Sequence, residues 1–84
     1  MFTKEALKNY IADYVTACNN LGVYFNMVIV FGSYSKNNAR EWSDVDLALD
    51  SDNFTGDILD DRGKISHANV KFFEIEPHLS YKLF

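Results

Sequence analysis

The sequence predicts a small α/β domain in which a mixed, three-stranded β-sheet is flanked by helices. Three observations predict this class. One segment has apolar residues at helical spacing, short runs rich in β-branched and aromatic residues follow it, and the chain has only 84 residues. We therefore expect a single domain, residues 1–84, and exclude functions that need separate cofactor and substrate domains.

The first predicted element is an amphipathic helix from Thr3 to Leu21. Its apolar residues recur at spacings of three and four, and polar side chains occupy the opposite face. Thr3 is suited to cap its start and Gly22 to end it. The apolar stripe consists of Leu7, Tyr10, Ile11, Tyr14, Val15, Cys18 and Leu21.

Two strands are predicted next. The segment from Val23 to Phe31 is uncharged and rich in β-branched and aromatic residues, which is typical of a strand in the middle of a sheet and covered on both faces. The polar stretch from Ser33 to Ser43 predicts a loop or short helix. From Asp44 to Asp50, acidic or small residues alternate with larger apolar ones, so we expect a strand. Its core-facing residues would be Val45, Leu47 and Leu49.

The last third of the chain predicts a turn, a helix and a strand. A turn-rich connection runs from Asp52 to Gly56, and a short acidic helix from Ile58 reaches toward Ser66. A third strand is predicted from Asn69 to Glu76, and Pro77 is expected to end it.

Charge and composition exclude several function classes. Eight basic and twelve acidic residues give a net charge of −4, which argues against free-standing binding to duplex DNA, because that function needs a basic surface. Between Glu41 and Asp61 lie eight carboxylates and no lysine or arginine. Within this cluster, the acids from Asp50 to Asp61 are expected to form a solvated loop and helix face, with contact to a basic partner surface as the alternative.

The single cysteine, Cys18, allows no intrachain disulfide, which favours a reducing compartment. No leader segment is evident, and the longest apolar run, from Met27 to Phe31, is too short to span a bilayer. We therefore expect a cytoplasmic protein that does not bind membranes. Its small core makes association with itself or with a partner favourable.

One constellation of residues indicates chemistry. Asp44 and Asp46 lie two apart on a predicted strand, so their carboxylates project side by side and repel each other unless a cation lies between them. Oxygen ligands of this kind suit Mg²⁺. Gly32 and Ser33 follow a predicted strand, where glycine lets the main chain approach a phosphate closely.

A third acid is expected from the last strand. Glu74 and Glu76 are both available, and alternation places them on the same face, so strand periodicity alone does not choose between them. His67 and His78 show no metal-ligand spacing with each other or with Cys18, and no function is assigned to them.

The sequence resembles the minimal nucleotidyltransferases of the DNA polymerase β-like superfamily. The likeness is carried by VIVFGSYSK (28–36), AREWSDVDLAL (39–49) and EIEPH (74–78). It implies a nucleotidyltransferase core in which Gly32 and Ser33 hold the triphosphate of ATP or of another nucleoside triphosphate. Lys36 and Arg40 are candidates to neutralise phosphate oxygens, with a solvated loop as the alternative for both.

The resemblance also implies a metal site. Asp44 and Asp46 would bind two Mg²⁺ ions, and a third acid would complete the site. Its place directly before a proline favours Glu76 over Glu74. Such a pair of ions clamps the attacking and leaving oxygens of an in-line displacement at the α-phosphate.

The resemblance extends to possible partners. Many small relatives are antitoxins that transfer AMP to a tyrosine hydroxyl of a helical HEPN-type toxin, and the spacing of Gly32-Ser33, ten residues, then Asp44-Val45-Asp46 is similar to theirs. The chain departs from the family by having Asn37 where a second glycine is common. Few residues follow the last strand, so we expect the acceptor to lie on another molecule. Two alternatives are a non-catalytic module that neutralises a partner by contact, and a nucleotide-binding domain without transfer activity.

Overall fold

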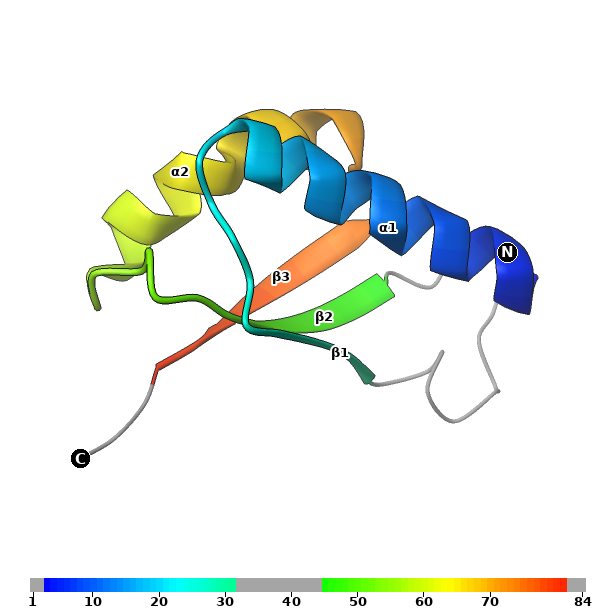
Figure 1. The fold of residues 1–84 in the computed structure, drawn as a ribbon, viewed down its shortest axis with the longest axis horizontal. Coiled ribbons are helices and arrows are strands. Elements are labelled where there is room, and N and C mark those ends of the chain that lie inside the picture. The colour runs from blue at the N-terminus through cyan, green and yellow to red at the C-terminus, as the bar shows by residue number, and fades with distance from the viewer. Residues whose placement is uncertain (1–2, 32–44, 82–84) are drawn as a thin grey trace.

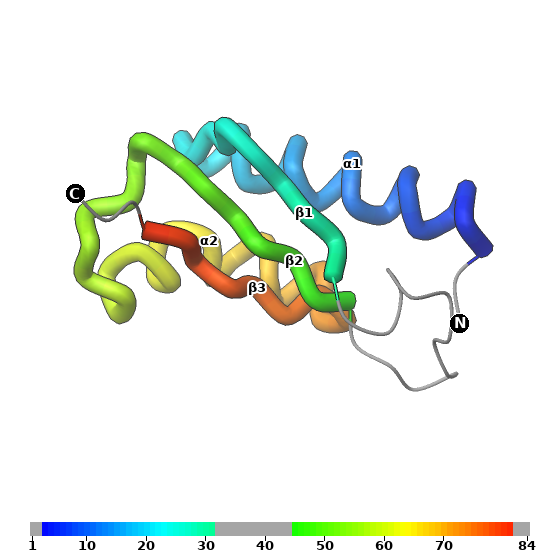
Figure 2. Tube along the Cα trace, turned by 90° about the horizontal axis from the view of Figure 1, so that it is seen from below, coloured from blue at the N-terminus to red at the C-terminus, as the bar shows by residue number. Residues whose placement is uncertain are grey.

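Two helices cover one face of a three-stranded sheet in the computed structural model of the protein, which describes residues 3–31 and 45–81 (Figure 1). The elements are helix α1 (Lys4–Asn20), strand β1 (Met27–Phe31), strand β2 (Val45–Asp50), helix α2 (Ile58–Lys71) and strand β3 (Ile75–Ser80). Seen from the side of the sheet, the strands lie in front of both helices (Figure 2). This confirms the predicted α/β class.

The sheet is mixed, with the strand order β1-β2-β3. Strand β1 pairs with β2 in antiparallel orientation, and β2 pairs with β3 in parallel. Helix α2 provides the crossover that a parallel pair requires. The predicted alternation in β2 is confirmed, because Val45, Leu47 and Leu49 are fully buried whereas the side chains between them are only partly buried.

Helix α1 agrees with its predicted bounds to within one residue. The Thr3 hydroxyl accepts a hydrogen bond from the Ala6 amide at 3.0 Å and caps the helix start. After the helix, Gly22 adopts a φ of +89°, a conformation that side-chain-bearing residues rarely adopt. Tyr14 and Cys18 of α1 are fully buried in the hydrophobic core.

The prediction for β1 was wrong in two respects. The strand begins at Met27 rather than at Val23, and it lies at the edge of the sheet rather than in its middle. On the face away from the helices, the side chains of Met27, Ile29 and Phe31 remain 38–49% exposed. The apolar composition that indicated burial on both faces therefore reflects one core face and one open face of an edge strand.

The bounds of the last helix and strand also differ from the prediction. Asn69 was predicted to begin the third strand, but α2 continues to Lys71. Asn69 instead links α1 to β3. Its side chain accepts a hydrogen bond from the Tyr14 hydroxyl at 2.8 Å and donates one to the Ile75 carbonyl at 3.1 Å. Pro77 was predicted to end the strand, but it lies within β3. Because β3 is an edge strand, a proline there need not remove a hydrogen bond to β2. The Pro77 carbonyl accepts a hydrogen bond from the Arg62 guanidinium at 3.2 Å.

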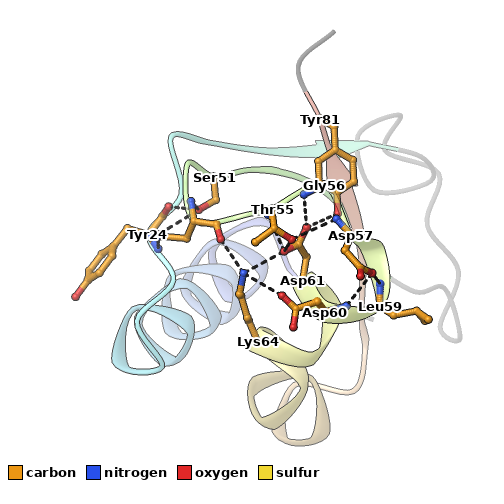
Figure 3. A network of polar contacts seen from close by, with 11 residues as sticks. Tyr24, Ser51, Thr55, Gly56, Asp57, Leu59, Asp60, Asp61, Lys64 and Tyr81 are labelled. Carbon is orange, nitrogen blue, oxygen red and sulfur yellow. Dashed lines mark hydrogen bonds and ion pairs between the residues drawn. The ribbon is translucent and has the colours of Figure 1, made fainter.

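A buried carboxylate joins the start of α2 to the end of β3 (Figure 3). The Asp61 side chain is fully buried, so the prediction of a solvated acidic face was wrong for this residue. It accepts hydrogen bonds from the amide and hydroxyl of Thr55, the Gly56 amide, the Lys64 ammonium and the Tyr81 hydroxyl, at 2.7–3.1 Å. These donors replace the water that burial removes.

Candidate active site

The candidate site lies on the open face of the sheet, at one end of β2. Asp46 projects to this face because its neighbours Val45 and Leu47 project into the core. In the parallel pairing of β2 with β3, Asp46 is the register partner of Glu76. In the antiparallel pairing on the other side, its partner is Phe31. Asp46 is thus flanked by a carboxylate on one strand and an aromatic ring on the other.

Several predicted site residues lie outside the described part of the chain. These are Gly32, Ser33, Lys36, Arg40 and Asp44, and their roles stay predictions. The residues on either side of this segment are described. Phe31 is the last residue of β1 and Val45 is the first of β2, and both lie at the end of the sheet that carries Asp46.

A third side chain, His78, completes the cluster around Asp46. His78 Nε2 lies 3.2 Å from Asp46 Oδ1 and 3.9 Å from Glu76 Oε1. Its imidazole also packs edge-on against the Phe31 ring, with 4.8 Å between the ring centroids. One atom from each of Asp46, Glu76 and His78 lies within 4.8 Å of the others.

Sequence reasoning missed His78, although the signal was present. His78 follows Glu76 by two residues, and residues two apart on a strand share a face. A search for metal-ligand spacing among His67, His78 and Cys18 alone overlooks a pairing of His78 with a carboxylate. The decisive information is the register that sets Glu76 beside Asp46, since it brings His78 to the same acid from a neighbouring position.

The two candidate third acids occupy different places. Glu74 precedes β3, its carbonyl accepts from the Val45 amide at 2.8 Å, and its main chain lies close to Tyr10 of α1. Within the described residues, the cluster around Asp46 contains Glu76 and not Glu74. The local reason is the start of β3 at Ile75, which aligns Glu76 with Asp46 across the strand pair.

The exposure and chemistry of the cluster suit a divalent cation. The side chains of Asp46, His78 and Glu76 are 25%, 43% and 53% exposed, so an ion and a phosphate can reach them from solvent. Carboxylate oxygens are the donors that Mg²⁺ prefers, and Asp46 and Glu76 supply them here. Among the described residues, no lysine or arginine forms an ion pair with Asp46 or Glu76. The residues present therefore fit a metal ion, which would offset the repulsion between the two acids.

Two other side chains with reactive groups lie in the core rather than at this site. Burial raises the pKa of the Cys18 thiol to about 11, which keeps it protonated near neutral pH. Burial also raises the pKa of Tyr14 far above its usual value, and its hydroxyl is engaged with Asn69. Both side chains therefore belong to the packing of α1 rather than to the open face.

In the described part of the chain, neither helix has the length and hydropathy that crossing a bilayer would require.

Residues 19–84 match the family model described as "Nucleotidyltransferase domain", so the match covers well over half of the chain. It includes all the strands, helix α2 and the Asp46 cluster. No curated protein and no solved structure matches the chain.

Proposed function

Because the chain belongs to the nucleotidyltransferase domain family, we propose that it transfers AMP from ATP to a hydroxyl group of a partner protein in a Mg²⁺-dependent reaction. The single observation that carries this proposal is the register of β2 with β3, which sets the carboxylates of Asp46 and Glu76 side by side on the open face. Like charges in that position are unfavourable unless they bind a cation.

In this proposal, the chain's own residues bind and orient the reactants. Asp44 and Asp46 would hold two Mg²⁺ ions, and Glu76 would complete the site. The ions supply charge neutralisation at the α-phosphate and at the departing pyrophosphate. Gly32 and Ser33 would bind the triphosphate through the main chain and a hydroxyl, and Lys36 and Arg40 would neutralise its outer oxygens.

The acceptor in this proposal is a protein, namely a helical toxin of the HEPN type. Two observations support a protein acceptor. The spacing of Gly32-Ser33 and Asp44-Val45-Asp46 is similar to that of the antitoxins of such pairs. In addition, the exposed apolar side chains of Met27, Ile29 and Phe31 share the open face with the carboxylates. A row of exposed apolar residues beside a reactive site suits contact with a protein surface.

The proposal is tested by following transfer of label from α-labelled ATP to the protein encoded by the neighbouring gene. We expect Mg²⁺-dependent labelling by the wild type and a loss of about 100-fold or more in Asp46→Asn, which removes a metal-binding charge. Asp50→Asn is the matched control, because Asp50 lies on the same face at the far end of β2 and pairs with Ser80 rather than Glu76. It should label normally. Absence of labelling by the wild type, or equal loss in both variants, would refute the proposal.

The exposed apolar side chains of Met27, Ile29 and Phe31 also favour the alternative of a binding module that acts by contact. An assay with the same partner protein distinguishes this module from a transferase. A double variant, Asp44→Ala with Asp46→Ala, should bind the partner but fail to neutralise it if transfer is the function. If the double variant neutralises the partner as well as the wild type does, the protein acts by contact alone.

A further inference from the structure

We propose that His78 is a nitrogen ligand in the cation site of Asp46 and Glu76, and that it raises the affinity of this site for Mn²⁺ without a matching gain for Mg²⁺. The inference deepens the proposed function, on which it rests for the identity of the site. It concerns a residue to which sequence reasoning assigned no role.

The geometry of the cluster supports ligation from both strands. Asp46 approaches from β2, whereas Glu76 and His78 approach from β3 as neighbours on one face. An octahedral ion with bonds of about 2.1 Å holds adjacent ligand atoms about 3 Å apart. The observed separations from His78 Nε2 are 3.2 Å to Asp46 and 3.9 Å to Glu76. Small rotations of these partly exposed side chains bring three ligand atoms to the spacing of one coordination sphere.

The orientation of the imidazole is constrained by its surroundings. The Phe31 ring packs edge-on against it and restricts its rotation. Nε2 is the ring nitrogen that faces both carboxylates. A histidine–carboxylate pair that is this exposed contributes little to the stability of the fold. Stabilisation of the fold is therefore a weak reason for this arrangement.

The donor set distinguishes between metals. Mg²⁺ is a hard ion that prefers oxygen ligands and keeps several waters. Mn²⁺ accepts carboxylate oxygens as Mg²⁺ does, but as a first-row transition metal it binds imidazole nitrogen more readily than Mg²⁺ does, and less tightly than the later metals of the series. A site with two carboxylates and one imidazole therefore binds Mn²⁺ more tightly than a site with oxygen donors alone.

The direct test is pulsed electron paramagnetic resonance of the protein loaded with Mn²⁺. We expect ¹⁴N modulation from a coordinated imidazole in the wild type and its loss in His78→Gln, whose amide offers an oxygen instead. His67→Gln is the matched control, because His67 is exposed on α2, and it should keep the modulation. Wild type without ¹⁴N modulation, modulation that persists in His78→Gln, or failure of the wild type to bind Mn²⁺ would each overturn the proposal.

Calorimetric titration with each metal alone supplies a second readout. His78→Gln should lose about tenfold or more in Mn²⁺ affinity and should keep its Mg²⁺ affinity within about threefold. Equal losses for both metals would contradict nitrogen ligation. These measurements need neither nucleotide nor acceptor, so a negative result leaves the transfer assay standing, and a failed transfer assay leaves the metal result readable. A thermal melt of each variant checks that the fold is retained.

Discussion

At the scale of single residues, Asp61 shows how the fold tolerates a carboxylate without solvent contact. Burial alone would raise the pKa of the Asp61 carboxyl, but hydrogen bonds from Thr55, Tyr81, Lys64 and Gly56 outweigh it and hold the pKa well below its usual value. Burial and the same contact raise the pKa of the Tyr81 hydroxyl to about 12, so it stays protonated and donates. The carboxylate therefore stays charged in the folded protein and ties the end of β3 to the start of α2.

This arrangement predicts a specific pH dependence of stability. The pKa of Asp61 is lower in the folded chain than in the unfolded chain, where it is about 3.9. Its stabilisation is therefore complete above about pH 4 and is lost as the pH falls through the folded value. Asp61→Asn should lower the unfolding free energy at pH 7 and flatten its acid dependence.

Urea denaturation of the wild type and of Asp61→Asn between pH 3 and pH 7 measures both effects. Asp60→Asn is the matched control, because Asp60 is the exposed neighbour of Asp61 in the same helix turn and forms a long ion pair with Lys64. It should change the unfolding free energy by about 0.5 kcal/mol or less. An unchanged acid slope in Asp61→Asn would contradict the interpretation.

At the scale of elements, helix α2 is longer than its sequence pattern predicts and contains a glycine. Asp57 caps its start by accepting hydrogen bonds from the Leu59 and Asp60 amides. Gly63 lies inside the helix, is exposed, and has open space where a Cβ would lie. Glycine in a helix interior loses more backbone entropy on folding than alanine does. Gly63 therefore makes α2 less stable than alanine at the same position would.

Gly63→Ala is expected to raise the unfolding free energy by about 0.5–1 kcal/mol. Gly56 provides the contrasting position, because its φ of +98° strains any residue with a side chain although the space around it is also open. Gly56→Ala should therefore destabilise the protein by about 1 kcal/mol. Denaturant titrations of the two variants should move in opposite directions, and a shift in the same direction would argue against this account of α2.

At the scale of the whole molecule, the described residues form one hydrophobic core, between the helices and one face of the sheet. Leu47, Leu49 and Ile65 are almost fully buried there. The opposite face carries the exposed apolar row of β1 and the Asp46 cluster. Stability and the proposed chemistry are thus assigned to opposite faces of the same three strands, because alternation along each strand separates them.

Substitutions on the two faces should therefore have different effects. Leu47→Ala should cost about 2–5 kcal/mol of unfolding free energy, because it leaves a cavity in the core. Ile29→Ala removes a side chain that is 45% exposed and should cost well under that amount, about 1 kcal/mol or less. Ile29→Ala should instead weaken partner binding in a calorimetric or pull-down titration. Equal destabilisation by the two substitutions would contradict an open second face.

Sequence alone determined those features that depend on local pattern. The helical period of its apolar residues predicted α1. The alternation of β2 assigned Val45, Leu47 and Leu49 to the core and Asp46 to the other face. Both predictions succeeded because the geometry of each element follows from its own residues. The motifs around Gly32 and Asp44 resembled those of nucleotidyltransferases, and the match to the nucleotidyltransferase family model covers both.

Only the tertiary structure decided which residues meet across the sheet. Local periodicity carries no information on strand order, so it missed that β1 and β3 are edges and that β3 accommodates Pro77. It also did not reveal the burial of Asp61, whose donors come from a turn, a helix and the end of the last strand. The place of His78 beside Asp46 follows from the β2–β3 register, a relation between residues 32 positions apart in sequence.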